Sequence, residues 1–206
     1  LASVAAVSAV RGIPTTVIGY APAQYYVRSD DHDGGQQLVR YVIGLGHRDI
    51  GIITVPDNMN YAVNERLRGV REGLDEAGIT FDTHRIFLGD YSIPSGVLAC
   101  QQLLEAHPTV TAILCMNDRM AIGAIQHLTA IGRRVPEDVT VMGYDDIALA
   151  SVFAPKLSTI NQQASALGEI ATRMLFDILD GRTPEPVIIP VELMIRSSSG
   201  GVRSQQ

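Results

Sequence analysis

Polar side chains that could bind a small ligand follow an apolar, strand-like segment of the sequence. The segment VTVMGY, residues 139–144, is followed directly by Asp145 and Asp146. Short apolar runs bounded by turn-forming residues are typical of buried strands. Open parallel sheets bind their ligands beyond the carboxyl ends of their strands, so a carboxylate here could belong to a binding site.

Other predicted strands are also followed by side chains that can contact a ligand. The side chains at or just beyond these ends, or in the first turns of the helix that follows, are those of Tyr20, Asn60, Arg66, Tyr91, Asn117, Asp118 and Asp145. Aromatic faces can stack on a ligand, and amides, carboxylates and a guanidinium donate and accept hydrogen bonds in fixed directions. This combination suits a small polar ligand.

Each of these side chains also has an ordinary structural interpretation. Asn117 and Asp118 fit the cap of the helix that follows them, because Asn and Asp are favoured there. Arg66 fits a solvated helix residue, and Tyr91 fits packing at the edge of the core. The two aspartates after residue 144 fit the cap of a short helix. Their shared position at strand ends favours ligand contact.

Catalytic and metal-binding patterns are missing from the sequence. The five histidines are dispersed, and no HExxH, GxSxG or phosphate-binding loop occurs. The segment DHDGG, residues 31–35, lacks the spacing of a calcium loop or dinucleotide fingerprint and fits a turn that caps the next helix. Asp118 and Asp145 could form an acid/base pair, but nothing supplies a nucleophile. We therefore expect binding, with no catalytic residue, metal or cofactor.

Strand-like and helical segments alternate along most of the chain. The predicted strands cover residues 15–20, 49–55, 85–90, 112–116 and 139–144, and the predicted helices cover 31–46, 61–77, 95–107 and 119–132. Such alternation predicts crossover connections and parallel sheets. A strand at 157–162, a long amphipathic helix and two strands split by Pro190 follow. These last elements break the regular alternation, as expected if the chain returns to a second, neighbouring sheet. We therefore predict two α/β lobes.

Composition narrows the class of protein. The chain has 206 residues, is 46% apolar and carries a net charge of -6, which predicts a folded globular protein that does not itself attract nucleic acid. Cys100 and Cys115 form no disulfide framework or metal motif, which favours a reducing cytoplasm. No segment is typical of a membrane span or a signal peptide. The opening LASVAAVSAV resembles the middle of a helix, so we expect the natural chain to begin earlier.

Four segments together resemble one known family. They are LGHRDIGII (45–53), ERLRGVREGLDEAGI (65–79), MNDRMAIGAIQHLTAIGRRVPEDVTVMGYDD (116–146) and PKLSTINQ (155–162). In this order they resemble the regulatory core of the lactose repressor (LacI) family of bacterial transcription factors, which is also similar to periplasmic sugar-binding proteins. The resemblance runs from about Ile13 to Arg196.

The resemblance implies two Rossmann-like lobes of the periplasmic-binding-protein type I, joined by three crossings, with a small effector held in the cleft. It assigns residues 1–32 and 162–193 to an N-terminal lobe that is incomplete here, and residues 33–161 and 194–206 to a C-terminal lobe. It also implies a homodimer, and a DNA-binding headpiece that this sequence does not include.

The resemblance also implies which residues touch the effector. By position, Arg66 and Asp145 grip its polar atoms, Tyr20 and Tyr91 stack on it, Asn117 and Gln162 are amide contacts, and Asp118 is an acidic neighbour. Two positions depart from the family pattern. Many relatives have an acidic residue where this chain has Gly19, and a small hydroxyl residue where it has Ala62.

We therefore interpret the chain as the effector-binding and dimerisation core of a cytoplasmic LacI-family repressor that senses a sugar. Effector bound in the cleft would fix the angle between the lobes and thereby the spacing of the headpieces on operator DNA. The main alternative is a periplasmic sugar-binding protein of a transport system, which the natural N-terminus would distinguish. A second alternative is an enzyme that uses Asp118 and Asp145.

Overall fold

The structure is a computed structural model that describes residues 12–20, 23–56 and 61–202. The chain forms two compact units. The first comprises the chain up to Asp30 together with Gln162–Val191, and the second comprises Asp31–Asn161 together with the chain from Glu192 onward. We describe each unit by itself. Their assignment as the two lobes of an effector-binding core stays a prediction.

The second unit is built on a parallel four-stranded sheet with the order β4-β3-β5-β6. Its strands are β3 (Ile50–Thr54), β4 (Ile86–Leu88), β5 (Ala112–Cys115) and β6 (Thr140–Met142). Every residue of β3 and β5 is buried. Parallel sheets are covered on both faces, which explains why these strands read as continuous apolar runs and not as alternating ones.

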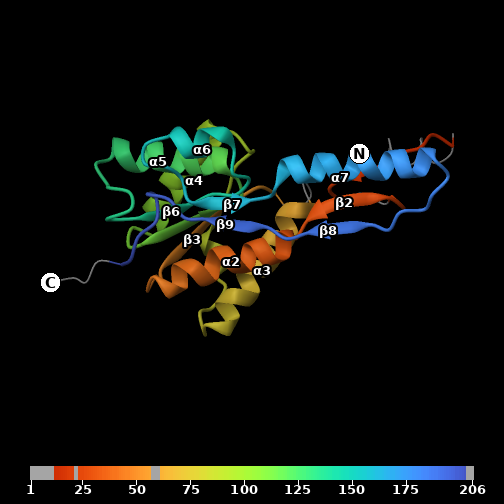
Figure 1. The fold of residues 1–206 in the computed structure, drawn as a ribbon. Coiled ribbons are helices and arrows are strands. Elements are labelled where there is room, and N and C mark those ends of the chain that lie inside the picture. Colours follow the sequence, from red (N-terminus) through yellow and green to blue (C-terminus); the bar gives the residue numbers. More distant parts are fainter. Residues whose placement is uncertain (1–11, 21–22, 57–60, 203–206) are drawn as a thin grey trace. The chain divides into compact units, whose positions relative to one another are not determined.

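Two pairs of helices cover this sheet, one pair on each face (Figure 1). Helices α2 (Asp31–Gly44) and α3 (Tyr61–Glu76) pack together on one face, and α4 (Ile93–Ala106) and α5 (Asp118–Ala130) on the other. A 3-10 turn at Thr83–Arg85 and the short helix α6 (Ala148–Val152) complete this part of the unit. The predicted alternation of strand and helix is confirmed.

Glycines let α2 and α3 approach backbone to backbone. A Cβ atom added at Gly35 would lie 2.0 Å from the carbonyl oxygen of Arg66, and one at Gly69 would lie 2.0 Å from that of His32. The prediction that DHDGG forms a turn before the helix was wrong, because the helix already begins at Asp31. Glycine lowers helix propensity, but here it allows a contact that any side chain would block.

The second unit also contains an antiparallel strand pair at its boundary with the first unit along the chain. It consists of β7 (Thr159–Asn161) and β9 (Glu192–Met194), with Asn161 opposite Glu192. The unit ends at Asn161 and resumes at Glu192, so both strands lie where the chain leaves and re-enters it.

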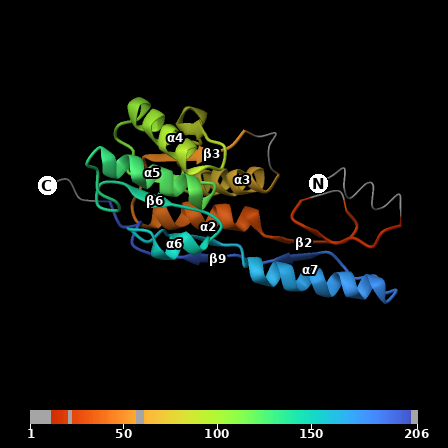
Figure 2. The same ribbon diagram turned by 90° about the horizontal axis from the view of Figure 1, so that it is seen from above.

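The first unit contains a parallel three-stranded sheet with the order β1-β2-β8. Its elements are β1 (Val17–Ile18), β2 (Tyr26–Ser29), α7 (Ala164–Leu179) and β8 (Val187–Ile189). Helix α7 runs along β2 and β8 (Figures 1 and 2) and buries a small core formed by Val27, Leu167, Ala171 and Ile189. The break of rhythm near the end of the sequence is the return of the chain to this sheet.

Both cysteines are free and buried in the second unit. Burial raises the pKa of Cys100 to about 12, so its thiol stays protonated and unreactive at neutral pH. Within the described ranges, no helix is both long and apolar enough to cross a membrane.

Candidate ligand-binding site

Arg66 is the centre of a polar cluster in the second unit. It lies one and a half turns into α3, and only 5% of its surface is exposed. Its Nε donates a hydrogen bond of 2.7 Å to Asp31 Oδ1, and its Nη1 donates one of 2.7 Å to the carbonyl oxygen of Met116. The guanidinium carbon lies 3.7 Å from the ring centroid of Tyr144. The interpretation of Arg66 as a solvated helix residue was therefore wrong.

The electrostatic surroundings keep Arg66 charged. Burial by itself lowers the pKa of the guanidinium, but Asp31 and Asp145 stabilise the cation, and the net effect is a pKa above the ordinary value. A buried charge is tolerated only when it is paired and hydrogen-bonded. In the part of the chain that the structure describes, Nη2 of Arg66 makes no hydrogen bond, so this atom can still donate to a ligand.

Asp145 places a carboxylate beside this guanidinium. Its Oδ1 lies 3.4 Å from Nη1 of Arg66, and 29% of its side chain is exposed. Its φ of 121° is unusual for a residue other than glycine, and its amide donates to the carbonyl oxygen of Ile160 at 2.9 Å. Strained backbone is found disproportionately at ligand sites, where the surrounding structure holds it in place.

Asn117 and Tyr91 extend the cluster. Asn117 caps α5 through its Oδ1, which accepts from the amide of Met120 at 2.9 Å, as the structural interpretation predicted. Its Nδ2 donates to the carbonyl oxygen of Tyr91 at 3.2 Å. Tyr91 has a φ of 70°, and among the described residues its buried hydroxyl has no hydrogen-bond partner. A buried polar atom without a partner is rare and marks a place for a ligand or an ordered water.

Asp118 supports the cluster from inside the unit. It is fully buried, and its two carboxylate oxygens accept from the Thr159 hydroxyl at 2.5 Å and from the Ile147 amide at 2.8 Å. Burial raises the pKa of this carboxyl group to about 7. The predicted cap of α6 by the aspartates after residue 144 was wrong, because Ile147 occupies the N-cap position without a side-chain hydrogen bond. Ligand contact by Asp118 stays a prediction.

The other predicted site residues lie elsewhere. Tyr20 belongs to the first unit, where the guanidinium of Arg28 lies 4.2 Å from its ring centroid. Gln162 begins the second segment of that unit, and its carbonyl oxygen accepts a 2.9 Å hydrogen bond from Ser29 Oγ. Asn60 lies outside the described residues. The roles of these three residues stay predictions.

Two residues of the cluster were missed in the sequence. In the sequence, Asp31 lies in a segment that fits a turn, and Tyr144 is the last residue of a predicted strand. Both are almost fully buried, at 3% and 0% exposure. A buried arginine requires a buried carboxylate near it, but the sequence showed no sign that Arg66 would be buried, because charged residues surround it.

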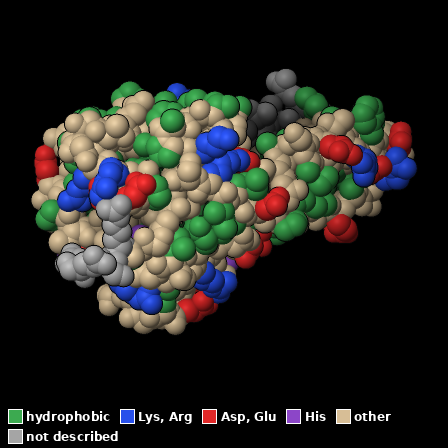
Figure 3. All heavy atoms as spheres, turned by 60° about the vertical axis from the view of Figure 1, so that its left-hand side comes forward, with side chains coloured by type: hydrophobic (Ala, Val, Ile, Leu, Met, Phe, Trp, Pro, Cys, Tyr) green, Lys and Arg blue, Asp and Glu red, His purple; other side chains and the backbone are tan. Residues whose placement is uncertain are grey.

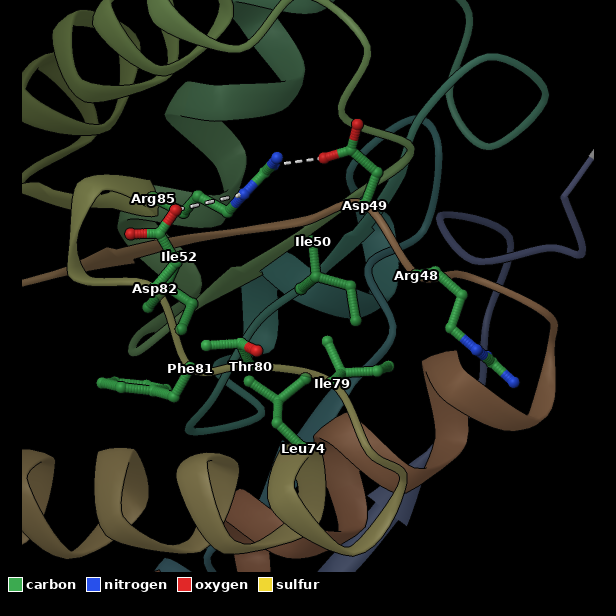
Figure 4. A pocket seen from close by; sticks show the side chains of 10 residues that line it. All are labelled: Arg48, Asp49, Ile50, Ile52, Leu74, Ile79, Thr80, Phe81, Asp82 and Arg85. Carbon is green, nitrogen blue, oxygen red and sulfur yellow. Dashed lines mark hydrogen bonds and ion pairs between the residues drawn. The ribbon is translucent and has the colours of Figure 1, made fainter.

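A separate cavity of about 300 Å³ lies at the other end of β3, beside Ile50 (Figure 4). Its apolar lining comes from the strand and from Leu74, Ile79 and Phe81. The close-up shows Arg85 at its edge, paired with Asp49 and Asp82. This cavity contains none of the residues that the sequence predicted to bind ligand.

Among the described residues, no cluster of three His, Cys, Asp or Glu side chains could hold a metal ion.

The cluster around Arg66 offers donors and an acceptor in fixed positions. A guanidinium held in place by two hydrogen bonds and an aromatic ring, next to a partly exposed carboxylate, can bind neighbouring hydroxyl groups or the polar edge of a ligand ring.

The sequence matches the family described as periplasmic binding protein-like domain over residues 39–199. The chain belongs to the periplasmic binding protein-like family.

Two relatives with similar sequences are named as transcriptional regulators. The chain is 41% identical over 175 residues to the HTH-type transcriptional regulator CelR of Thermobifida fusca, covering 84% of this chain and 51% of the relative. It is 39% identical over 185 residues to the HTH-type transcriptional repressor PurR of Escherichia fergusonii, covering 88% of this chain and 54% of the relative. The chain thus spans about half the length of the curated relatives it matches.

A solved structure supports the same assignment. The structure of the transcriptional regulator CelR in complex with cellobiose matches 91% of this chain and 59% of its own chain, with 39% identity and a TM-score of 0.83. The predicted fold of the periplasmic-binding-protein type and the predicted resemblance to LacI-family regulators are both confirmed.

Proposed function

We propose that this chain is the effector-binding core of a bacterial LacI-family transcriptional repressor whose effector is a sugar or sugar derivative. The observation that carries this proposal is the buried Arg66, locked by Asp31 and the carbonyl of Met116 beside the carboxylate of Asp145. The cluster lies at the carboxyl ends of parallel strands, where such sheets bind ligands. The sugar assignment is supported by the relative CelR, whose structure contains cellobiose.

Binding without catalysis fits the geometry better than an enzyme does. An acid/base pair of Asp118 and Asp145 would need both carboxyl groups to reach a substrate. Asp118 is fully buried, and both of its oxygens accept hydrogen bonds from the protein. The transport alternative is not retained, because the relatives are named transcriptional regulators.

We place the contact with operator DNA in a headpiece outside this sequence. On the face shown in Figure 3, Lys and Arg side chains lie in small groups beside Asp and Glu. Several exposed arginines are paired with carboxylates, among them Arg40, Arg68, Arg134, Arg173 and Arg182. Phosphate binding requires clustered cations that are available to neutralise the backbone of DNA.

A homodimer is part of the proposal. Exposed apolar side chains on unit 2 helices, such as Leu98 at 60% and Val152 at 75%, suit contact with a second protein surface. Light scattering of the natural full-length protein tests this point, and a monomer at micromolar concentration would contradict it.

The proposal is tested by operator binding in the natural full-length regulator. An effector changes DNA affinity only if it binds two conformations of the protein with different affinities. Operator affinity is measured with and without cellobiose, other disaccharides, pentoses, hexoses, phosphosugars, polyols and purines. We expect one sugar class to change operator affinity by at least about fivefold. A response to purines alone would contradict the sugar assignment, and hydrolysis of any of these compounds would contradict binding without catalysis.

A further inference from the structure

The two aspartates that follow β6 have different partners. Asp145 faces Arg66 in the cluster described above, at 3.4 Å. Asp146 instead accepts a hydrogen bond of 2.6 Å from Nη2 of Arg196 and one of 3.0 Å from Nδ2 of Asn161. The side chains of Asp146 and Arg196 are only 13% and 15% exposed. In this turn, the carboxylate of Asp145 therefore lies at the proposed effector site, and the carboxylate of Asp146 is bonded to another part of the unit.

The partners of Asp146 lie where the chain passes between the two units. Asn161 is the last residue before the chain enters the first unit, and the second unit resumes at Glu192, directly opposite it in the β7–β9 pair. Arg196 follows β9 by two residues and donates from Nη1 to the carbonyl oxygen of Leu157 at 2.8 Å, just before β7. The carboxylate of Asp146 therefore joins the segments that carry two of the three connections between the units.

The backbone of the turn is attached to the same strand. The amide of Asp145 donates to the carbonyl oxygen of Ile160 at 2.9 Å, and the amide of Asp146 lies 3.4 Å from the hydroxyl of Thr159. That hydroxyl donates in turn to Asp118, whose other oxygen accepts from the amide of Ile147. The turn cannot shift without disturbing β7, because its backbone and one of its side chains are both bonded there.

The conformation of the turn adds an independent argument. Asp145 and Asp146 have φ values of 121° and 54°, a backbone region that favours glycine. Two consecutive residues in this region persist only when the surrounding structure holds them. Glycine at these two positions would remove the strain, but it would also remove both carboxylates. The carboxylates make different contacts, with Arg66 and with Arg196.

We infer that Asp146 is a positioning residue for the effector response: it couples the turn that carries Asp145 to the β7 and β9 connections. The inference rests on the proposed function, because it concerns what happens after an effector contacts Asp145. Displacement of the turn by ligand is passed through Asp146 to Asn161 and Arg196, at the points where the chain passes to and returns from the first unit. Asp146 itself contributes little to effector affinity.

The test uses the natural full-length regulator and separates binding from response. For the wild type, Asp146→Asn and Arg196→Gln, calorimetry measures the dissociation constant of cellobiose or, if cellobiose does not bind the wild type, of the sugar from the panel above that changes its operator affinity. The dissociation constant of the operator is measured with and without a saturating concentration of that sugar. We expect effector affinity to stay within about threefold of the wild type. We expect the effector-induced change in operator affinity to shrink by at least about fivefold in both variants.

Asp49→Asn is the matched control, because it breaks a half-buried pair with Arg85 in the same unit, at the far end of β3. This variant should keep the full response. A full response in Asp146→Asn, or an equal loss in Asp49→Asn, would overturn the inference. If none of the compounds changes the operator affinity of the wild type, the proposed function is overturned, and the inference with it.

Hydrogen exchange on the wild type gives a second measurement that does not depend on the variants folding. Effector should change the protection of amides in β7 and β9. Changes confined to the residues around Arg66, with β7 and β9 unaffected, would contradict coupling through Asp146.

Discussion

At the scale of single residues, the fixed geometry of Arg66 is the main property of the site. The guanidinium is held by Asp31 and by the carbonyl of Met116, and it lies against the ring of Tyr144. Its position is therefore set before any ligand arrives. Preorganisation of this kind increases affinity because little conformational entropy is lost on binding.

Replacing Asp31 by alanine should destabilise the second unit strongly. The change leaves the buried Arg66 without its nearest carboxylate, and breaking a buried pair in this way costs about 3–5 kcal/mol. Urea denaturation measures the loss. Glu76→Ala is the control, because it removes an exposed partner of Arg40 and should cost no more than about 1 kcal/mol. Equal losses in the two variants would show that the Asp31–Arg66 pair does not stabilise the fold.

Asp118 should make stability depend on pH near neutrality. Its pKa is raised from 3.8 to about 7 in the folded protein, so between these values the folded state binds more protons than the unfolded one. The unfolding free energy should therefore fall as pH rises from about 4 to 7, by up to roughly 4 kcal/mol for this group, and stay level above.

Asp118→Asn should lack this decrease. Unfolding free energies of both proteins are measured in urea between pH 5 and pH 8. Their difference should change with pH in favour of the variant as the pH rises. Parallel curves would mean that Asp118 is already ionised throughout this range.

At the scale of elements, the contact between α2 and α3 places Asp31 against Arg66. Gly35 and Gly69 allow the two backbones to touch, and Gly34 accommodates Tyr144, whose hydroxyl would lie 2.1 Å from an added Cβ atom. The first turn of α2 can then lie beside the second turn of α3. Small residues at a helix interface are thus a condition for the site.

Gly35→Ala should separate the helices and weaken both the fold and the site. The added methyl group would meet a backbone carbonyl that cannot move aside, so we expect a loss of about 1–3 kcal/mol. Gly44→Ala in the same helix meets no atom within 4 Å and should be neutral or slightly stabilising. Thermal and urea unfolding measure both. An equal effect of the two substitutions would contradict the close contact.

The sequence predicted most elements and the meeting of several polar side chains at one end of the sheet, for a physical reason. Buried parallel strands read as short apolar runs, and their carboxyl ends fall at one edge of the sheet, so Arg66, Tyr91, Asn117 and Asp145 could be placed together. The partners of these residues could not be predicted in the same way. Asp31 and Asp146 act through contacts with residues 35 and 50 positions away, and no local pattern reports such contacts.

At the scale of the whole molecule, the chain passes between its two units three times, next to Asp31, Asn161 and Glu192. Asp31 and Asn161 are bonded to Arg66 and Asp146. Residues at the proposed effector site and residues at the connections are therefore in direct contact within the second unit. This arrangement suits a protein whose ligand must change its conformation and not only occupy a site.

The central claim is that the Arg66–Asp145 cluster binds the effector of a transcriptional regulator. The most direct measurement is a calorimetric titration of the natural full-length protein and its Asp145→Ala variant with cellobiose and, in the same series, other sugars and purines. Asp145→Ala removes a carboxylate that is 29% exposed and leaves Arg66 paired with Asp31, so the variant should still fold. We predict saturable binding of one sugar by the wild type, and affinity at least about tenfold weaker in the folded variant, because a charged hydrogen bond is lost. Equal affinity in the two proteins would contradict the account.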